Sequence, residues 1–161
     1  MSYSRGKAVA YAHQWAHGRN PRYANFDGMG GDCTNFISQC LYAGCGVMNT
    51  TPELGWYYFS LRNRSAAWSG VPYLYNFLTS NKGPGPYGQK VPLSQVQVGD
   101  VIQLSFDGET FGHSLLVVRT GETPAPENIL IAAHTDDSEN RPLDSYFYRI
   151  HRAIHILGAR E

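Results

Sequence analysis

Charged side chains are scarce in this 161-residue sequence: they make up 16% of it, and 13 basic residues cancel 13 acidic ones. Proteins that bind nucleic acid or anionic membranes usually carry a basic excess, so we predict neither partner. No apolar run is long enough to cross a membrane, and residues 1–17 lack the continuous apolar segment of a signal peptide. An extracellular or cell-wall location follows only if the chain belongs to a longer exported protein.

Cysteine is scarce as well, with Cys33, Cys40 and Cys45 spaced by seven and five residues. This spacing lacks the C-x₂-C pairs of a zinc site, and three cysteines are too few for a disulfide framework. Cys40 is predicted to be a buried packing residue, with a Cys40–Cys45 disulfide as the alternative. His13 and His17 lie one helical turn apart but have no third ligand nearby in sequence. We therefore predict no metal and no organic cofactor.

Apolar residues, by contrast, are plentiful enough at 42% to build a core. The length fits one domain over residues 1–161, which we expect to be monomeric. Apolar spacing predicts helices over residues 4–17, 33–43 and 71–81, and strands over residues 100–106, 111–119, 128–134 and 146–157. Residues 82–92 and 135–144 are predicted to be loops. Helices first and antiparallel strands later predict an α+β fold, with N-terminal helices packed on a C-terminal antiparallel sheet.

The segment Gly30-Gly31-Asp32-Cys33 places a thiol on the first turn of a predicted helix. Two glycines allow the positive-φ backbone that precedes a helix start, and Asp32 is a favoured N-cap residue. The helix dipole and the unpaired backbone N–H groups at that end are expected to lower the pKa of the thiol and favour the nucleophilic thiolate. The alternative is that Cys33 is a small buried residue, as most free cysteines are.

A nucleophilic thiol needs a base, and His113 is the best-placed histidine because it begins an apolar strand. His134 ends the next predicted strand. If the two strands are antiparallel neighbours, His134 can bind the second ring nitrogen of His113 and fix its tautomer. We therefore predict a relay of nucleophile, base and orienter. The remaining histidines are predicted to be surface or structural residues: His13, His17, His151 and His155.

These segments resemble the Putative amidase domain family of the papain-like superfamily, which also holds the NlpC-type and CHAP-type peptidoglycan hydrolases. The matching residues follow one another along nearly the whole chain: Tyr11-Ala12, Trp15-Ala16, Arg19-Asn20-Pro21, Tyr23, residues 30–36, residues 38–41, residues 56–58, residues 99–103, His113-Ser114, His134-Thr135 and residues 141–143. The resemblance implies a papain-like fold and an active enzyme, since no catalytic position is lost.

The resemblance implies catalytic roles for Cys33, His113 and His134. Tyr23 and Asp32 are the candidates for oxyanion or substrate binding. For Tyr23, the resemblance places a tyrosine near the nucleophile, where it can help to bind the oxyanion; the alternative is that it anchors a loop. Asp32 is expected to cap the helix rather than to carry a proton.

Together these observations predict a cysteine-dependent hydrolase that cleaves amide or peptide bonds through an acyl-enzyme. The resemblance implies a bacterial peptidoglycan peptide or amide bond as the substrate. An acyltransferase with the same site is one alternative. A non-catalytic wall-binding module is another, because the 11 tyrosines and three tryptophans suit a binding cleft as well as a core.

Overall fold

Helices fill the first half of the chain and a sheet fills the second half. The computed structural model describes residues 2–161. Its helices are α1 (Arg5–Trp15), α2 (Cys33–Cys45), α3 (Ala66–Ser69) and α4 (Val71–Ser80), with short 3₁₀ turns at Leu93–Gln95 and Leu143–Ser145. A small ribbon consists of β1 (Tyr58–Ser60) and β2 (Asn63–Arg64). The main sheet contains β3 (Gly85–Val91), β4 (Val101–Ser105), β5 (His113–Arg119), β6 (Leu130–Ala133), β7 (Ser138–Pro142) and β8 (Ile150–Arg160).

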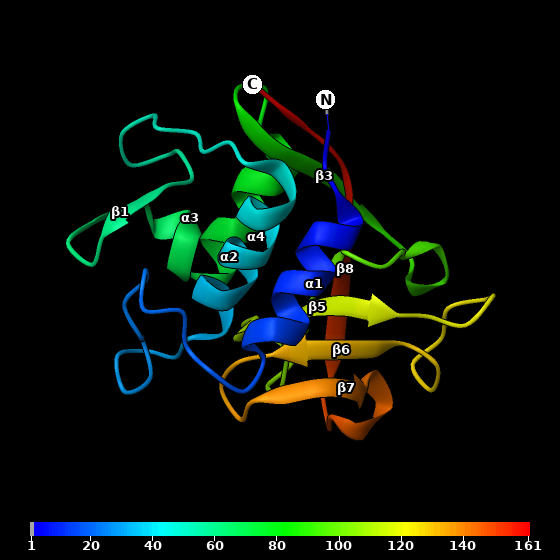
Figure 1. The fold of residues 1–161 in the computed structure, drawn as a ribbon. Helices are drawn as coiled ribbons and strands as arrows, with labels where there is room; N and C mark the ends of the chain where they lie inside the picture. Colours follow the sequence, from blue (N-terminus) through cyan, green and yellow to red (C-terminus); the bar gives the residue numbers. More distant parts are fainter. Residues whose placement is uncertain (1) are drawn as a thin grey trace.

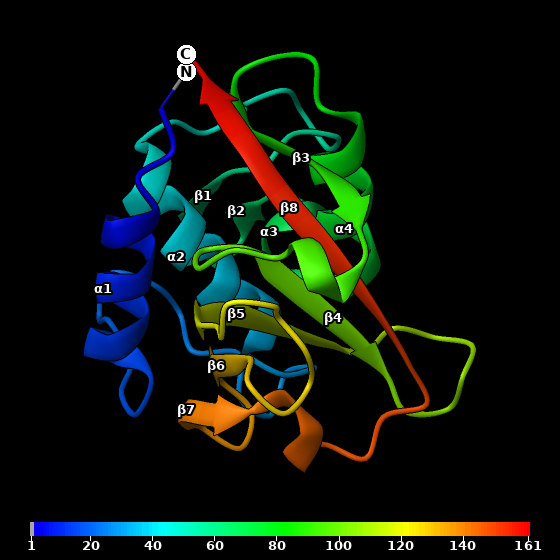
Figure 2. The same cartoon turned by 90° about the vertical axis from the view of Figure 1, so that its right-hand side faces the viewer.

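The main sheet has the strand order β3-β8-β4-β5-β6-β7, and all its neighbouring strands are antiparallel. The helices α1 and α2 pack over β5 and β6 (Figure 1). The long strand β8 crosses the molecule diagonally and pairs with both β3 and β4 (Figure 2). The structure therefore confirms the predicted α+β architecture, with helices on one face of an antiparallel sheet. None of the helices in residues 2–161 is long and apolar enough to cross a membrane.

Both faces of the central strand β5 are buried, which explains its continuous apolar sequence. Leu116 and Val118 belong to the core between sheet and helices. Leu115 and Val117 belong to a second core on the far face of the sheet, under the 3₁₀ turns and loops. Because side chains alternate along β5, Ser114 points to the helix side of the sheet, and His113 points to the same face as Leu115, the far face.

Two strands lie where the sequence predicts loops. β3 falls in residues 82–92, and β7 falls in residues 135–144. Both are edge strands, where proline and glycine are tolerated because one side of the backbone needs no partner. Their polar, proline-containing sequences carry no apolar alternation, and long-range pairing with β8 and β6 stabilises them instead.

The helix α2 is two residues longer than predicted, because Gly44 does not end it. Gly44 packs against the residues that lead into α1: a Cβ there would lie 2.6 Å from the Tyr3 ring. Gly46 ends the helix instead, with a φ of 70° that favours glycine, and its N–H donates to the carbonyl of Tyr42. Cys40 and Cys45 are both free thiols, so the alternative disulfide is not formed.

Candidate active site

Cys33 is the first residue of α2, and only 6% of it is exposed. Its sulfur lies 3.8 Å from the hydroxyl of Thr34. That hydroxyl is 2.9 Å from the hydroxyl of Ser114 at the start of β5, so a buried pair of hydroxyls joins the helix start to the central strand. The thiol is therefore fixed at the point where α2 meets β5.

The hydroxyl pair is part of a longer buried chain of hydrogen bonds. The side-chain amide of Gln103 donates to Ser114 (3.2 Å) and to the carbonyl of Val71 (2.9 Å). The amide oxygen of Gln103 accepts from Nε of Arg152 at 2.8 Å. Gln103 and Ser114 are both fully buried, and they link β4, β5 and α4 beneath the thiol. Buried polar groups satisfied in this way specify one arrangement of the elements that they join.

The expected lowering of the Cys33 pKa is not what the structure gives. Burial raises the pKa of the thiol, and this effect outweighs the opposing hydrogen bonds from Ser114 and Thr34. The free protein therefore holds Cys33 as a thiol rather than as a ready thiolate. Through the Thr34 hydroxyl, the sulfur is linked to Ser114, the residue next to His113.

His113 begins β5 and is 6% exposed. Its ring lies 5.6 Å from that of Tyr146 and 6.4 Å from that of Phe106. Burial, and then the cation of Arg141, lower the pKa of His113 to about 4, against a smaller opposing effect of Asp136. The imidazole is therefore neutral at physiological pH, as a general base must be.

In the described part of the chain, no hydrogen bond joins His113 to Cys33 or to His134. His113 points to the same face of the sheet as Leu115, and its ring contacts Tyr146 there. The thiol approaches the same strand from the helix side. The pairing of Cys33 with His113 thus stays a prediction that chemistry must test.

His134 has other partners than those predicted. Its Nδ1 lies 2.5 Å from Oδ2 of Asp32, and its Nε2 lies 2.7 Å from the carbonyl oxygen of Trp15. The ring stacks on Phe36 with 3.9 Å between centroids, and it is 1% exposed. Because both ring nitrogens are engaged, the expected hydrogen bond to His113 is wrong.

Asp32 occupies the N-cap position of α2, as predicted, but its carboxylate makes no capping hydrogen bond. Its Oδ1 accepts from the Phe26 N–H (2.8 Å) and the Asn35 amide (2.9 Å), while Oδ2 pairs with His134. Burial raises the pKa of this carboxyl, but hydrogen bonds from His134, Asn35 and Phe26 outweigh burial and lower it overall. Asp32 is therefore a buried carboxylate that ties the preceding loop to the helix start.

Arg19 closes this cluster from the solvent side. Its guanidinium makes two hydrogen bonds to Asp137, at 2.9 and 3.0 Å, and one to Asp27 at 2.8 Å. Its Nε lies 3.4 Å from Asp32, and its NH1 lies 3.2 Å from Nε2 of His134. Arg19 thus joins the loop before α2 to the loop after β6.

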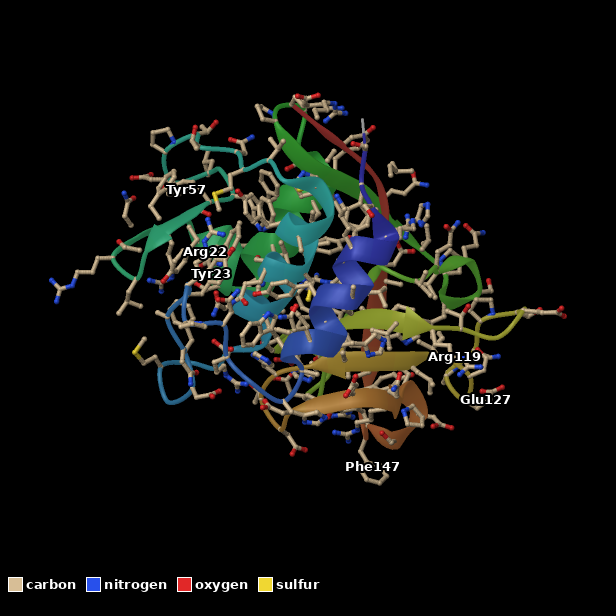
Figure 3. All side chains as sticks on the ribbon, viewed as in Figure 1. Arg22, Tyr23, Tyr57, Arg119, Glu127 and Phe147 are labelled. Carbon is tan, nitrogen blue, oxygen red and sulfur yellow. The ribbon has the colours of Figure 1, made fainter. Side chains whose placement is uncertain are left out.

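Tyr23 packs its ring in a cluster with two other aromatic side chains, 5.9 Å from Trp68 and 5.1 Å from Tyr58. It lies beside Arg22 on the loop that precedes α2 (Figure 3). Its hydroxyl makes no hydrogen bond within residues 2–161, and burial raises its pKa. Tyr23 therefore anchors the loop and keeps a neutral O–H donor; its oxyanion role stays a prediction.

The other histidines contact residues outside the candidate active site. His13 lies 2.6 Å from Glu139, which His17 also approaches at 3.6 Å. His155 pairs with buried Asp100 at 2.8 Å, and His151 packs on Tyr148. Among residues 2–161, no three His, Cys, Asp or Glu side chains are grouped as a metal site requires.

A pocket of about 490 Å³ lies beside His113, and sequence reasoning did not find it. Its wall includes Arg141, Tyr146 and Phe147, which come from β7 and the segment after it. The segment Arg141-Pro142-Leu143 appears in the resemblance to the amidase family, but its position beside His113 depends on the β6–β7 pairing. A one-dimensional pattern carries no signal for that pairing.

The chain is thus an α+β domain in which Cys33 lies at the buried start of α2. The chain belongs to the family described as "Putative amidase domain", whose model matches residues 2–157. That description indicates a hydrolase acting on amide bonds. The chain is also 33% identical over 143 residues to "Uncharacterized protein YhbB" of Bacillus subtilis (strain 168). The match covers 88% of this chain and 44% of the relative, so the chain spans less than half of that protein. No solved structure matches, and the papain-like part of the resemblance therefore stays a prediction.

We expect iodoacetamide to label Cys33 faster than Cys45, although Cys45 is the more exposed residue. Backbone N–H groups of Ser114 and Thr34 stabilise the Cys33 thiolate once it forms, and the raised pKa makes the labelling rate increase with pH. Peptide mass mapping at several pH values measures both effects. Faster labelling of Cys45 or Cys40 would contradict a nucleophilic Cys33.

Proposed function

We propose that the chain is a cysteine-dependent hydrolase of amide or peptide bonds, with Cys33 as nucleophile and His113 as base. The observation that carries the proposal is the position of the Cys33 thiol. It begins the buried helix α2 and lies beside the Thr34 hydroxyl, which is hydrogen-bonded to Ser114, the residue next to His113. Membership in the amidase family supports an amide bond as the target.

In this proposal, the thiol loses its proton to His113 during attack and not beforehand. Burial raises the pKa of the thiol, while burial and Arg141 lower the pKa of His113. In the free protein, the Cys33 thiol and the His113 imidazole are therefore both neutral. The imidazole must approach the sulfur during turnover. His113 is the first residue of β5, so its side chain stands at the strand end, one residue from Ser114, whose hydroxyl is linked through Thr34 to the sulfur.

The bond between Sγ and the substrate carbonyl carbon then forms. The resulting oxyanion accepts a hydrogen bond from the N–H of Cys33 at the helix start. The Tyr23 hydroxyl is the second candidate donor. His113 returns the proton to the leaving amine as the C–N bond breaks, and water hydrolyses the thioester with His113 again as base. The scheme uses neither a metal nor an organic cofactor.

We assign His134 and Asp32 a positioning role in this scheme. The pair holds the loop of residues 24–31 against the start of α2, through the bonds of Asp32 to Phe26 and Asn35. This arrangement fixes where the thiol stands relative to β5. Neither side chain carries a proton of the reaction.

We propose the peptide or amide bonds of bacterial peptidoglycan as the substrate class, on the resemblance to wall-lytic hydrolases. The experiment is digestion of purified peptidoglycan and of a synthetic peptide library, with released amino groups measured by reaction with a fluorogenic amine reagent. Wild-type protein is expected to release them, and Cys33→Ala protein is not. Equal release by both would contradict the proposal.

An acyltransferase uses the same thioester but passes the acyl group to an amine. Adding glycine amide to the same digestion, at a concentration far below that of water, separates the two reactions, because a transferase forms the acylated amine as its main product. We expect free carboxylate products, and a mass spectrum dominated by acylated amine would replace the hydrolase with the transferase.

A further inference from the structure

The pocket beside His113 contains a cation whose hydrogen-bonding edge is little used. Arg141 stacks on the Tyr146 ring, with 3.6 Å from guanidinium carbon to ring centroid, and its Nε donates to the Ser145 hydroxyl at 2.7 Å. These two contacts hold the guanidinium plane. Its terminal nitrogens make only long contacts of 3.4–3.5 Å, to Asp136, Ser138 and Ser145. A planar fork held in this way is suited to bind a carboxylate with two parallel hydrogen bonds.

The charge in the pocket also favours an anion. Asp136 is the nearby carboxylate, but its side chain is 89% exposed, whereas that of Arg141 is 27% exposed. Water therefore screens Asp136 more than it screens Arg141. In agreement, Arg141 affects the pKa of His113 more strongly than Asp136 does.

Two exposed phenyl rings flank the cation. Phe106, which directly follows β4, is 49% exposed. Phe147 is 95% exposed and projects from the lower edge of the molecule (Figure 3). Large apolar side chains exposed beside a charged pocket are typical of a binding site. They provide apolar surface within the same pocket as the Arg141 guanidinium.

The chemistry of the proposed function tells which part of a substrate lies here. The imidazole that takes the thiol proton returns it to the leaving amine, so the leaving nitrogen lies at the ring nitrogen that faces the thiol. The rest of the leaving group then extends past His113, on the side away from Cys33. That side is this pocket, since His113 lines it and Cys33 does not.

We propose that this pocket binds the leaving amine of the substrate by a carboxylate placed next to its nitrogen. The carboxylate pairs with Arg141, and an apolar side chain of the same residue lies against Phe106 and Phe147. The substrates are then N-acyl amino acids or peptides cut at their last amide bond. The Sγ–C bond forms as the C–N bond breaks, the thiol proton passes through His113 to the nitrogen, and a free amino acid leaves. This inference rests on the proposed function for the direction of the substrate.

Binding of the released amine tests the inference without turnover. The probes are L- and D-phenylalanine and the matching phenylalaninamides, added to Cys33→Ala protein while NMR follows the His113 ring signals. We expect one enantiomer of phenylalanine to bind saturably, and to raise the pKa of His113 because the carboxylate neutralises Arg141. The amide is expected to bind at least about tenfold more weakly, the loss typical of one charged hydrogen-bonding pair.

Variants of the pocket identify the group responsible. Arg141→Gln is expected to remove the preference for the acid over the amide, and Arg141→Lys to restore part of it. Asp136→Asn is expected to tighten acid binding, because a competing carboxylate is lost. Arg149→Gln is the matched control: Arg149 is exposed and its NH1 donates to the carbonyl of Asp107. Its backbone N–H donates to the carbonyl of Ser105, the neighbour of Phe106, but Arg149 does not line the pocket.

Each outcome counts for or against the inference. No saturable binding of any probe, or equal binding of acid and amide, overturns it, as does a preference that survives Arg141→Gln. If Arg141→Gln protein does not fold, Asp136→Asn and Arg141→Lys decide in the same assay. Absence of Cys33-dependent hydrolysis, with acid-selective binding intact, overturns the proposed function and leaves a carboxylate-binding site.

Discussion

Cys33→Ala is expected to reduce kcat by a factor on the order of 10⁵–10⁶, and His113→Ala by a similar factor. The nucleophile and its base act as one unit, so removing either leaves only binding and oxyanion stabilisation. The double variant is therefore expected to be no slower than either single variant. Rates of amine release at saturating substrate measure all three losses.

Matched controls exist for both positions. Cys45→Ala removes a half-buried thiol at the other end of α2, and His151→Ala removes a histidine of β8 that packs on Tyr148. Both are expected to keep kcat within a few-fold of wild type. Additive losses in the Cys33→Ala, His113→Ala double variant would mean that the two residues act independently, and the pairing would then be wrong.

The pH profile of kcat/KM gives a second check on His113. The base must be neutral, and its pKa of about 4 keeps it neutral well below the ordinary 6.5. The acid limb of the profile is therefore expected near pH 4. Arg141→Gln removes a cation that lowers this pKa, so the same limb should move to higher pH. An acid limb that stays at 6.5 in wild type would exclude His113 as the base.

Local patterns account for what the sequence predicted correctly. Helical spacing and a glycine pair before Asp32 place Cys33 at a helix start, and period-two alternation or apolar runs identify β4, β5 and β6. The edge strands β3 and β7 were missed, because pairing with distant strands and not local pattern stabilises them. The pocket around Arg141 was missed for the same reason.

The predicted hydrogen bond between His113 and His134 is wrong because it depends on the register of β5 and β6, which a single sequence does not determine. Leu116 pairs with Ala132, and continuing that register by two residues places His134 opposite Ser114. Because neighbouring residues of a strand point to opposite faces, His134 then faces the helix layer and His113 does not. A shift of one residue in the same pairing would have put the two rings on one face.

Asp32→Ala is expected to lower the free energy of unfolding by about 3–5 kcal/mol, because several buried donors lose their acceptor at about 1–3 kcal/mol each. The carboxylate side chain is 1% exposed, and its loss leaves the Phe26 N–H, the Asn35 amide and His134 without their acceptor. Urea unfolding followed by tryptophan fluorescence measures the loss. Such a loss is a large part of the stability of an ordinary domain.

Asp27→Ala is the control, because Asp27 also pairs with Arg19 but is 45% exposed. We expect a loss below about 1 kcal/mol there, as for other exposed ion pairs. The wild-type protein should also show the effect in acid. The pKa of Asp32 is lowered in the folded state, so its stabilising effect is complete above the ordinary carboxyl pKa and disappears as pH falls through the lowered one. Equal losses in the two variants would show that burial of Asp32 is not what makes it stabilising.

His134→Ala separates a positioning role from a relay. It removes the partner of Asp32 and the ring stacked on Phe36, so a loss of stability similar to that of Asp32→Ala is expected. The folded fraction, however, should keep a substantial part of kcat and an unchanged acid limb, because His134 makes no contact with the ring of the base. Complete loss of kcat in protein shown to be folded would return His134 to the reaction itself, and would require a register of β5 and β6 other than the one described.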